Sequence, residues 1–217
     1  MGNSRRAGSA MPRYTFNGDP VTYVVPTLID LDEIGFRLAR MARVSGIPLE
    51  TTVVISNGAL PYSTSVHNHL GNTGKIITIG MSYYDFDRVR QRAEVVQDLS
   101  DNVEGKAVFL LDEVVDRGGT MPVAIEHIRS SGAKSVHSGT LIYKRRSAYL
   151  PDFVGEAIED EWVVFPHDIR PSVEQIAKKW RNLDVPESDI RSRLQQLFER
   201  SPHLMEQLDH YQTKTLV

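Results

Sequence analysis

The chain has 217 residues, of which 41% are hydrophobic and 24% are charged, and its formal net charge is -3. These values are typical of a globular protein with one substantial core, and they lack the basic excess of proteins that bind nucleic acid through its backbone. The chain has no cysteine, which excludes disulfides, thiolate catalysis and cysteine-ligated metals. No apolar run approaches the roughly 20 residues that span a bilayer, and residues 1–11 lack the apolar core of a signal peptide. We therefore expect a cytoplasmic protein that binds neither nucleic acid nor a membrane.

Helical spacings and short apolar runs alternate along residues 30–165. Helices are expected where apolar residues recur every three or four positions, and buried strands where β-branched residues follow one another. In chain order these criteria predict a helix at 30–45, a strand at 51–56, a helix at 61–70, strands at 75–81 and 107–111, a helix at 120–131 and strands at 136–143 and 161–165. Strands that alternate with helices of this length predict a parallel sheet flanked by helices.

Two stretches depart from this alternation. Residues 82–101 are rich in charge and poor in core-forming side chains, so we expect a long mobile loop there. From residue 171 onward the pattern is purely helical, with candidate helices at 172–180, 187–200 and 202–211. The second of these has an apolar face, which packs either on the sheet or on another copy of the chain. That face consists of Ile190, Leu194, Leu197 and Phe198.

One segment combines several signals of a ligand site. An apolar run ends in two acidic residues, Asp112 and Glu113, and a glycine-bearing turn at residues 116–119 then leads into a helix. In open α/β sheets ligands bind at the carboxyl ends of strands, and glycines before a helix N-terminus allow backbone N–H groups to hold a phosphate. Two carboxylates at the end of an apolar strand need partners, which ribose hydroxyls would supply. The segment thus predicts a ligand with a sugar diol and a phosphate; the alternative is an acidic turn before a capped helix.

The segment from Val108 to Thr120 resembles the motif with which type I phosphoribosyltransferases bind 5-phosphoribosyl-1-diphosphate (PRPP). The resemblance implies that Asp112 and Glu113 orient the ribose hydroxyls and that Asp116 is the catalytic carboxylate beside the base. It also implies that the turn holds the 5′-phosphate through Arg117, Gly118, Gly119 and Thr120. Arg117 stands where threonine is usual, at a position whose backbone does most of the binding.

Three later segments resemble the hypoxanthine, guanine and xanthine enzymes of that family: residues 139–145, 151–155 and 162–166. In these enzymes the lysine that matches Lys144 donates to the 6-oxo group of the purine. The aromatic residue that matches Trp162 stacks on the base, and the backbone at Val163 meets the base edge. An ammonium group only donates hydrogen bonds, so Lys144 suits a 6-oxopurine better than adenine. Ser82 and Tyr83 resemble the pair on the lid loop that closes over the site.

The resemblance also implies Mg²⁺ as cofactor and a loop that contacts pyrophosphate. Mg²⁺ would be held by three carboxylates, those of Asp112, Glu113 and Asp168, the last at a spacing that differs from the family by one residue. The pyrophosphate loop corresponds to Asn57, Gly58 and Ala59, where the family usually carries a lysine or arginine followed by two glycines. The turn glycine is kept as Gly58, whereas the cation and the second glycine are not.

The sequence therefore predicts an α/β protein with a parallel twisted sheet flanked by helices, the type I phosphoribosyltransferase fold, with a small hood and a helical C-terminal extension. We expect a flexible tail at 1–20, the phosphoribosyltransferase domain with its hood at 21–170, and the extension at 171–217. The expected activity is that of a purine phosphoribosyltransferase (a pentosyltransferase), acting on PRPP and a 6-oxopurine as a homodimer or homotetramer. The alternatives are a PRPP-sensing regulatory protein with little catalysis, which the loop at Asn57 favours, and an enzyme of this fold for a different base.

Overall fold

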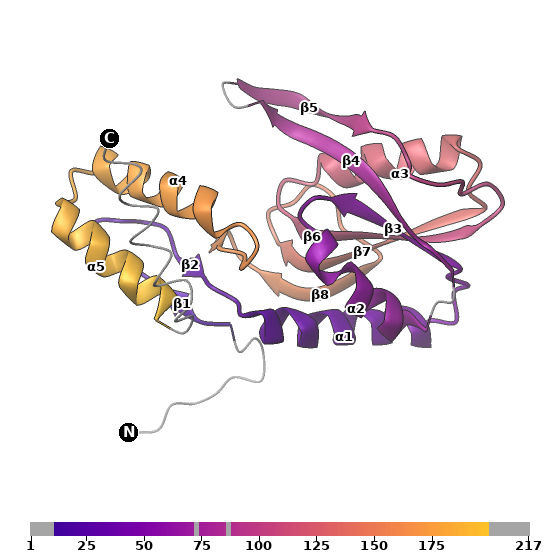
Figure 1. Cartoon of the computed structure of the whole chain (residues 1–217), viewed down its shortest axis with the longest axis horizontal. Coiled ribbons are helices and arrows are strands. Elements are labelled where there is room, and N and C mark those ends of the chain that lie inside the picture. Colours follow the sequence, from indigo (N-terminus) through magenta and orange to yellow (C-terminus); the bar gives the residue numbers. More distant parts are fainter. Residues whose placement is uncertain (1–10, 72–73, 86–87, 200–217) are drawn as a thin grey trace. The chain divides into compact units, whose positions relative to one another are not determined.

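The computed structural model describes residues 11–71, 74–85 and 88–199, and the chain divides into two compact units. Leu31–Asp160 forms one of them, which we call the sheet unit. The described residues of Met1–Asp30 and Glu161–Val217 form the other, which we call the terminal unit. Each unit contains its own β-sheet (Figure 1).

A six-stranded sheet with the order β5-β4-β3-β6-β7-β8 forms the sheet unit. Its strands are β3 (Thr51–Ser56), β4 (Ile76–Asp85), β5 (Arg88–Gln97), β6 (Ala107–Val115), β7 (Ser135–Lys144) and β8 (Phe153–Ile158). All neighbouring strands pair parallel except β4 and β5, which pair antiparallel. The predicted α/β class with a mostly parallel sheet is confirmed.

Helices cover both faces of this sheet (Figure 1). They are α1 (Leu28–Val44), α2 (Leu60–Leu70) and α3 (Thr120–Ser130). Successive residues of a strand point to opposite faces, and this alternation decides which helix each residue meets. Val53 of β3 and Leu110 of β6 share a buried cluster with α3. The neighbouring Thr52 instead lies 2.8 Å from the His67 ring nitrogen of α2, measured from its hydroxyl oxygen.

The expectation of a mobile loop at residues 82–101 is wrong. β4 continues to Asp85, and β5 returns beside it as the edge strand of the sheet. Ala93 of β5 is buried, and Val95 packs against the cluster around α3. An edge strand has one face and one side open to water, so it needs few apolar residues and its composition resembles that of a loop.

The strand expected at residues 161–165 is shorter than predicted and lies outside the main sheet. β9 (Trp162–Val163) pairs parallel with β2 (Tyr23–Val24), which pairs antiparallel with β1 (Arg13–Tyr14). These three strands form the sheet of the terminal unit. In the main sheet the strand beside β7 is β8, which the sequence analysis did not single out because its residues are only partly apolar.

The C-terminal helices α4 (Ile169–Asn182) and α5 (Glu187–Phe198) complete the terminal unit. They share a core with Tyr23, and Trp180 is fully buried in it. The apolar face predicted for the second C-terminal helix, which consists of Ile190, Leu194, Leu197 and Phe198, is buried in the same core. These four residues therefore need no other copy of the chain to cover them. The helix predicted at 202–211 and residues 1–10 of the predicted tail lie outside the described residues.

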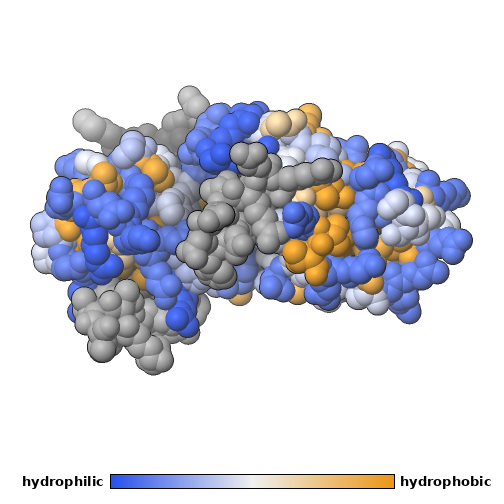
Figure 2. Space-filling view, turned by 90° about the horizontal axis from the view of Figure 1, so that it is seen from above, coloured by the Kyte–Doolittle hydropathy of each residue, from blue (hydrophilic) through white to orange (hydrophobic). Residues whose placement is uncertain are grey.

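One face of the protein is seen in the space-filling view. The face shown in Figure 2 is mostly hydrophilic, and its hydrophobic residues lie in separate groups. No helix within the described ranges is both long enough and apolar enough to cross a bilayer. Such a surface is usual for a protein whose large apolar side chains fill internal cores.

A buried carboxylate joins the strands and helices of the terminal unit. Asp19 accepts hydrogen bonds from the Tyr23 hydroxyl and the Trp180 indole, both at 2.6 Å, and it pairs with Lys179. Burial alone would raise the pKa of Asp19, but Lys179 and the hydrogen bonds lower it to about 2. The ionised carboxylate therefore stabilises the fold above the unfolded pKa of about 3.9. This stabilisation is lost as the pH falls through about 2.

Replacing Asp19 by alanine should lower the free energy of unfolding by about 3–5 kcal/mol at pH 7, because two buried donors lose their acceptor. Urea unfolding followed by tryptophan fluorescence measures this loss in the terminal unit, which contains both tryptophans of the chain, Trp162 and Trp180. The matched control is Asp189→Ala, which removes an exposed carboxylate from α5 and should cost at most about 1 kcal/mol. The difference between wild type and Asp19→Ala should shrink toward pH 2, and equal losses in both variants would contradict the role of Asp19.

Candidate functional site

A cavity of about 340 Å³ opens in the sheet unit at the carboxyl ends of β3 and β6. The loops that follow these two strands line most of it, and Met81 of β4 lines a further part. Nine of the predicted site residues line this cavity: Asn57, Gly58, Asp112, Glu113, Asp116, Arg117, Gly118, Gly119 and Thr120. The tertiary structure thus brings together two loops that are more than 50 residues apart in the sequence.

Parallel strand pairing places the two loops side by side. β3 pairs with β6 from Thr51 opposite Val108 to Val54 opposite Leu111, so both strands end at the same edge. Each strand is followed by a short loop and then by a helix, α2 after β3 and α3 after β6. The first turn of α3 lines the cavity. Its backbone N–H groups have no partner within the helix, and the helix dipole makes this end attractive to an anion.

Two glycines allow the loops to approach their neighbours closely. Gly118 has φ of +82°, and a Cβ at this position would lie 2.6 Å from the backbone nitrogen of Tyr149. A Cβ on Gly58 would lie 1.7 Å from Oε1 of Glu113. The loop after β3 therefore packs directly on the acidic pair at the end of β6, and a larger residue at position 58 would require the Glu113 carboxylate to move.

Among the described residues, no cation forms an ion pair with Asp112 or Glu113, the acidic pair. Asp112 is buried, and its Oδ1 accepts a hydrogen bond of 2.9 Å from the Glu113 backbone N–H. Burial, and next the adjacent Glu113, raise the pKa of Asp112 well above its usual range. Burial and the charge of Glu113 also raise the pKa of the nearby Tyr62 hydroxyl. Hydroxyl donors or a cation placed at this pair would relieve the repulsion between the carboxylates.

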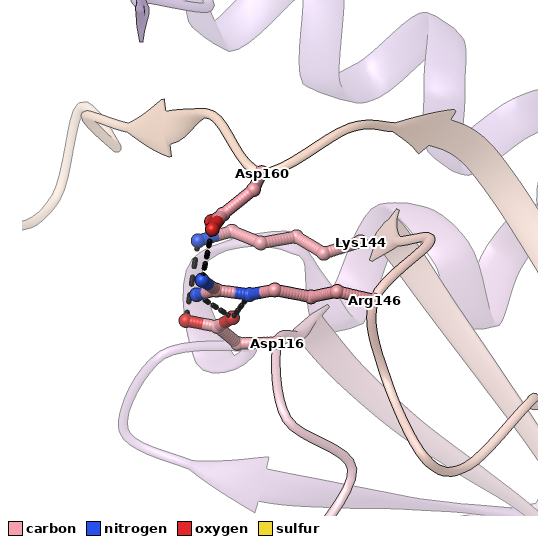
Figure 3. A network of polar contacts seen from close by, with 4 residues as sticks. All are labelled: Asp116, Lys144, Arg146 and Asp160. Atoms are coloured by element: carbon pink, nitrogen blue, oxygen red, sulfur yellow. Dashed lines mark hydrogen bonds and ion pairs between the residues drawn. The ribbon is translucent and has the colours of Figure 1, made fainter. Parts of the chain in front are cut away.

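Asp116, at the start of the turn, is the centre of a second charged group (Figure 3). It accepts from Lys144 at the end of β7, at 3.1 Å, and from Nε of Arg146, at 3.0 Å. Arg146 also pairs with Asp160, while Lys144 is buried despite its charge. Burial would raise the pKa of Asp116, but the Arg146 hydrogen bond and the Lys144 charge lower it below its usual range. Asp116 is therefore held ionised.

Arg146 was not predicted as a site residue. It follows Lys144 and Arg145 in a run of three cations, and no local pattern distinguishes the two arginines. In the structure Arg145 pairs with Glu159 at 3.2 Å, where both side chains are exposed, whereas Arg146 turns toward Asp116. The ion pair with Asp116 spans 30 residues, so only the folded chain identifies it.

Three other predicted residues of the sheet unit lie around this site. Ala59 is buried at the start of α2 and does not line the cavity. Ser82 lies in β4, one residue after the cavity-lining Met81. The backbone of Tyr83 also belongs to β4, and its side chain lies outside the described part of the protein. The assignment of Ser82 and Tyr83 to a lid stays a prediction.

The remaining predicted residues, Trp162, Val163 and Asp168, belong to the terminal unit. The ring centroid of Trp162 lies 6.0 Å from that of Tyr23, and Val163 is buried in β9. Asp168 immediately precedes α4, and burial raises its pKa against the opposing effect of His167. Trp162 is partly buried and Asp168 is exposed, and the roles of these three residues at the base and the metal stay predictions.

The described residues include no group of three or more His, Cys, Asp or Glu side chains that could hold a metal. In the cavity the protein offers the two neighbouring carboxylates of Asp112 and Glu113. A cation bound there would take its other ligands from a ligand or from water. Mg²⁺ is commonly held in this way, by one or two carboxylates together with phosphate oxygens.

The model of the phosphoribosyl transferase domain family matches residues 49–172, more than half of the chain. The chain belongs to this family. The match includes every residue of the cavity and also Lys144, Arg146 and Asp160. The phosphoribosyl transferase domain thus carries the whole site described above, and the resemblance drawn from residues 108–120 is confirmed.

Curated relatives match this phosphoribosyl transferase domain at modest identity. The hypoxanthine-guanine phosphoribosyltransferase of Bacillus subtilis (strain 168) is 28% identical over 114 residues, which are 51% of this chain and 63% of that protein. The xanthine-guanine phosphoribosyltransferase of Idiomarina loihiensis is 28% identical over 119 residues, 54% of this chain and 70% of that protein. The chain thus spans less than two thirds of the length of the Bacillus relative.

A solved structure confirms the fold of the domain. The purine phosphoribosyltransferase from Pyrococcus horikoshii Ot3 superimposes with a TM-score of 0.58 and 24% identity. The superposition covers 66% of this chain and 92% of the archaeal chain. At this identity the likeness establishes the fold, and the substrate has to be inferred from the site.

The contact between Gly58 and Glu113 can be tested by a double-mutant cycle. Gly58→Ala should destabilise the protein by about 1–3 kcal/mol, because the added methyl group meets the Glu113 carboxylate. In a Glu113→Ala background the same glycine substitution should cost much less, since the carboxylate is gone. Chemical unfolding followed by circular dichroism measures all four proteins. An equal cost of Gly58→Ala in both backgrounds would show that the loop does not pack on Glu113.

Proposed function

We propose that this chain is an enzyme that transfers the 5-phosphoribosyl group of PRPP to a nitrogen of a 6-oxopurine. The base would be hypoxanthine, guanine or xanthine, and the products a nucleoside 5′-monophosphate and pyrophosphate. The principal support is the cavity at the end of β6, where an acidic pair, a glycine turn at a helix N-terminus and the ion-paired Asp116 meet. The two curated relatives named above are both purine phosphoribosyltransferases, which supports the same class of base.

PRPP would lie along the cavity with its 5′-phosphate at the turn before α3. The backbone N–H groups of residues 117–120 and the Thr120 hydroxyl supply donors there, and the helix dipole adds a favourable field. Asp112 and Glu113 would accept hydrogen bonds from the ribose hydroxyls, which satisfies two carboxylates that otherwise repel each other. The pyrophosphate would meet the loop of Asn57, Gly58 and Ala59. That loop lacks a cation, and the Ala59 N–H already donates to the Ile55 carbonyl, so the backbone amides of Asn57 and Gly58 would supply the contacts.

Mg²⁺ fits the chemistry of the acidic pair. Asp112 and Glu113 would hold it directly or through the ribose hydroxyls, and Asp168 is the further carboxylate that the resemblance implies. Burial, and next the adjacent Glu113, raise the pKa of Asp112, and a bound cation would offset both effects, which supports this assignment. When bound, the ion supplies neutralisation of the charge that develops on the departing pyrophosphate.

Asp116 and Lys144 would recognise the base and move its proton. The bond from C1 of the ribose to pyrophosphate breaks as the bond from C1 to the purine nitrogen forms, and the proton of that nitrogen passes to the Asp116 carboxylate. The Lys144 ammonium has three donors, so it can contact Asp116 and still donate to the 6-oxo oxygen. Trp162 would stack on the base, and the backbone of Val163 would meet its edge. Closure by Ser82 and Tyr83 would exclude water from the reactive sugar cation.

A PRPP-dependent activity screen tests this function. The full chain is assayed for pyrophosphate release with hypoxanthine, guanine, xanthine, adenine and uracil, with and without Mg²⁺, and PRPP binding is measured by calorimetry. Turnover with an oxopurine that requires Mg²⁺ is the expected result. Turnover only with adenine or uracil would assign a different base.

A PRPP-sensing regulatory protein is the second candidate, and the loop at residues 57–59 is the observation that favours it. This loop lacks the cation that the resemblance leads us to expect at the pyrophosphate position. A regulator would bind PRPP in the same cavity without transferring its sugar to any base. PRPP binding without turnover in the screen would therefore support this candidate and contradict the enzyme.

Asp116→Asn should retain PRPP binding and lose about 10²- to 10⁴-fold in kcat, because the amide cannot accept the purine proton. Steady-state kinetics with the preferred base and calorimetry with PRPP measure the two effects separately. The matched control is Asp98→Asn, which removes an exposed carboxylate that pairs with His127. The control should keep wild-type turnover. Full activity of Asp116→Asn would remove this residue from the chemistry.

Arg146→Met should shift the acid limb of the kcat/KM profile to higher pH. The hydrogen bond from Arg146 lowers the pKa of Asp116, so its loss favours the protonated carboxyl, which cannot act as a base. Arg146→Lys keeps the charge and should shift the limb less. Arg145→Met removes the same charge from an exposed pair and serves as control. An unchanged acid limb in Arg146→Met would mean that Asp116 does not set it.

A further inference from the structure

The helix α1 exposes apolar side chains to an unusual degree, and three of them lie opposite its buried face: Ile29, Phe36 and Val44. Five of the nine exposed large hydrophobic residues in the described part of the chain lie on this helix: Leu28, Ile29, Phe36, Met41 and Val44. The opposite face of the helix is buried and includes Leu31, Ile34, Leu38 and Ala42. A helix that rests on a core normally has one apolar stripe and a polar outer face. The second apolar face of α1 is therefore a candidate interaction surface.

Within this face Ile29, Phe36 and Val44 lie on one stripe together with two charges, Glu33 and Arg40. With 3.6 residues per turn, these five positions follow one another along one side of the helix. Ile29 and Val44 are each 73% exposed at the two ends of the stripe. Phe36 at its middle is 44% exposed, and its ring also packs edge-on against the His69 ring of α2, with the centroids 5.2 Å apart.

The charged residues beside the stripe already have partners on other elements of the protein. Arg37 pairs with Glu156 at 3.0 Å, Arg43 donates to the backbone oxygen of His69 at 2.9 Å, and Ser65 donates to Asp32. Among the described residues none forms an ion pair with Glu33 or Arg40. These two side chains are therefore the charges of α1 that remain available to a partner on its outer face.

The charges of α1 are also separated along its length. The acidic residues Asp30, Asp32 and Glu33 occupy the first half, and the basic residues Arg37, Arg40 and Arg43 occupy the second half. A helix with this arrangement is complementary to a copy of itself that runs in the opposite direction. A parallel copy would instead place like charges together, which is unfavourable.

We propose that α1 packs antiparallel against α1 of a second copy of this chain across a two-fold axis. With the axis between Phe36 and Arg37, Glu33 lies opposite the partner's Arg40 and Ile29 lies opposite the partner's Val44. The same register places Phe36 beside the partner's Arg37, whose alkyl stem can cover the ring while the guanidinium stays paired with Glu156. Each contact occurs twice, as a two-fold interface requires. This inference does not depend on the proposed enzymatic activity.

The size of this surface sets the expected affinity. A helix of 17 residues is about 25 Å long, and a pair of such helices buries less area than a stable obligate interface does. We therefore expect a dimer that forms on the order of micromolar protein concentration. Sedimentation velocity with the full chain, over a concentration series that brackets this range, measures the association.

Charge reversal on the stripe tests the register. Glu33→Arg places two arginines opposite each other, and Arg40→Glu places two glutamates opposite each other, so each variant should lose at least about 10-fold in dimer affinity. The double variant Glu33→Arg with Arg40→Glu restores both pairs and should recover most of the affinity. A mixture of the two single variants should also associate, because each supplies the charge that the other needs. Glu126→Arg, an exposed position on α3, makes the same charge change elsewhere and should leave association unchanged.

The recovery on mixing also shows that both single variants are folded. A wild-type chain that stays monomeric throughout the concentration series would overturn the proposal. Association that neither single variant weakens would place the interface elsewhere and overturn it equally. The same conclusion follows if the single variants dissociate and neither the double variant nor the mixture recovers.

Discussion

β6 pairs parallel with β3 on one side and with β7 on the other, and its residues from Ala107 to Leu111 are buried. Because all three strands run in the same direction, the loops that follow them meet at one edge of the sheet. The strand register fixes the face of the sheet to which each acidic side chain points. In the observed register Asp112 lies opposite Thr140 of β7. A slip of one residue would exchange the faces to which Asp112 and Glu113 point, and it would also bury polar groups inside the sheet.

This arrangement places two carboxylates in environments that shift their pKa values in opposite directions. Asp112 is buried beside another acid, so its pKa is raised, whereas Asp116 is held by two cations and its pKa is lowered. Carboxyl groups whose environments separate their pKa values usually have different tasks. The uncompensated pair suits hydroxyls and a metal ion. The compensated Asp116 stays ionised beside Lys144, which suits the acceptance of a proton. The two carboxylates that differ in this way, Asp112 and Asp116, are only four positions apart in the sequence.

The elements of the sheet unit could be predicted closely where local patterns are strong. The strand expected at 51–56 is β3 without change, and the helices expected at 61–70 and 120–131 differ from α2 and α3 by a single residue at one end. Glycine or proline residues mark the ends of such elements. Between them, β3 is an almost fully buried apolar run, and the helices carry a buried apolar face. β5 was missed because an edge strand buries little. Trp162 and its neighbours were expected in the main sheet, but their pairing partner is β2, about 140 residues earlier.

The sequence by itself determined the acidic pair, the glycine turn and the helix that follows it, because these residues are adjacent and their chemistry is local. It also determined the choice of Lys144 as a donor, through the resemblance to a family. Only the tertiary structure decided that Arg146 and not Arg145 meets Asp116, and that Gly58 packs on Glu113. These contacts join residues 30 to 55 positions apart. Their geometry depends on strand register and on the close packing of loops, which no local pattern in the chain encodes.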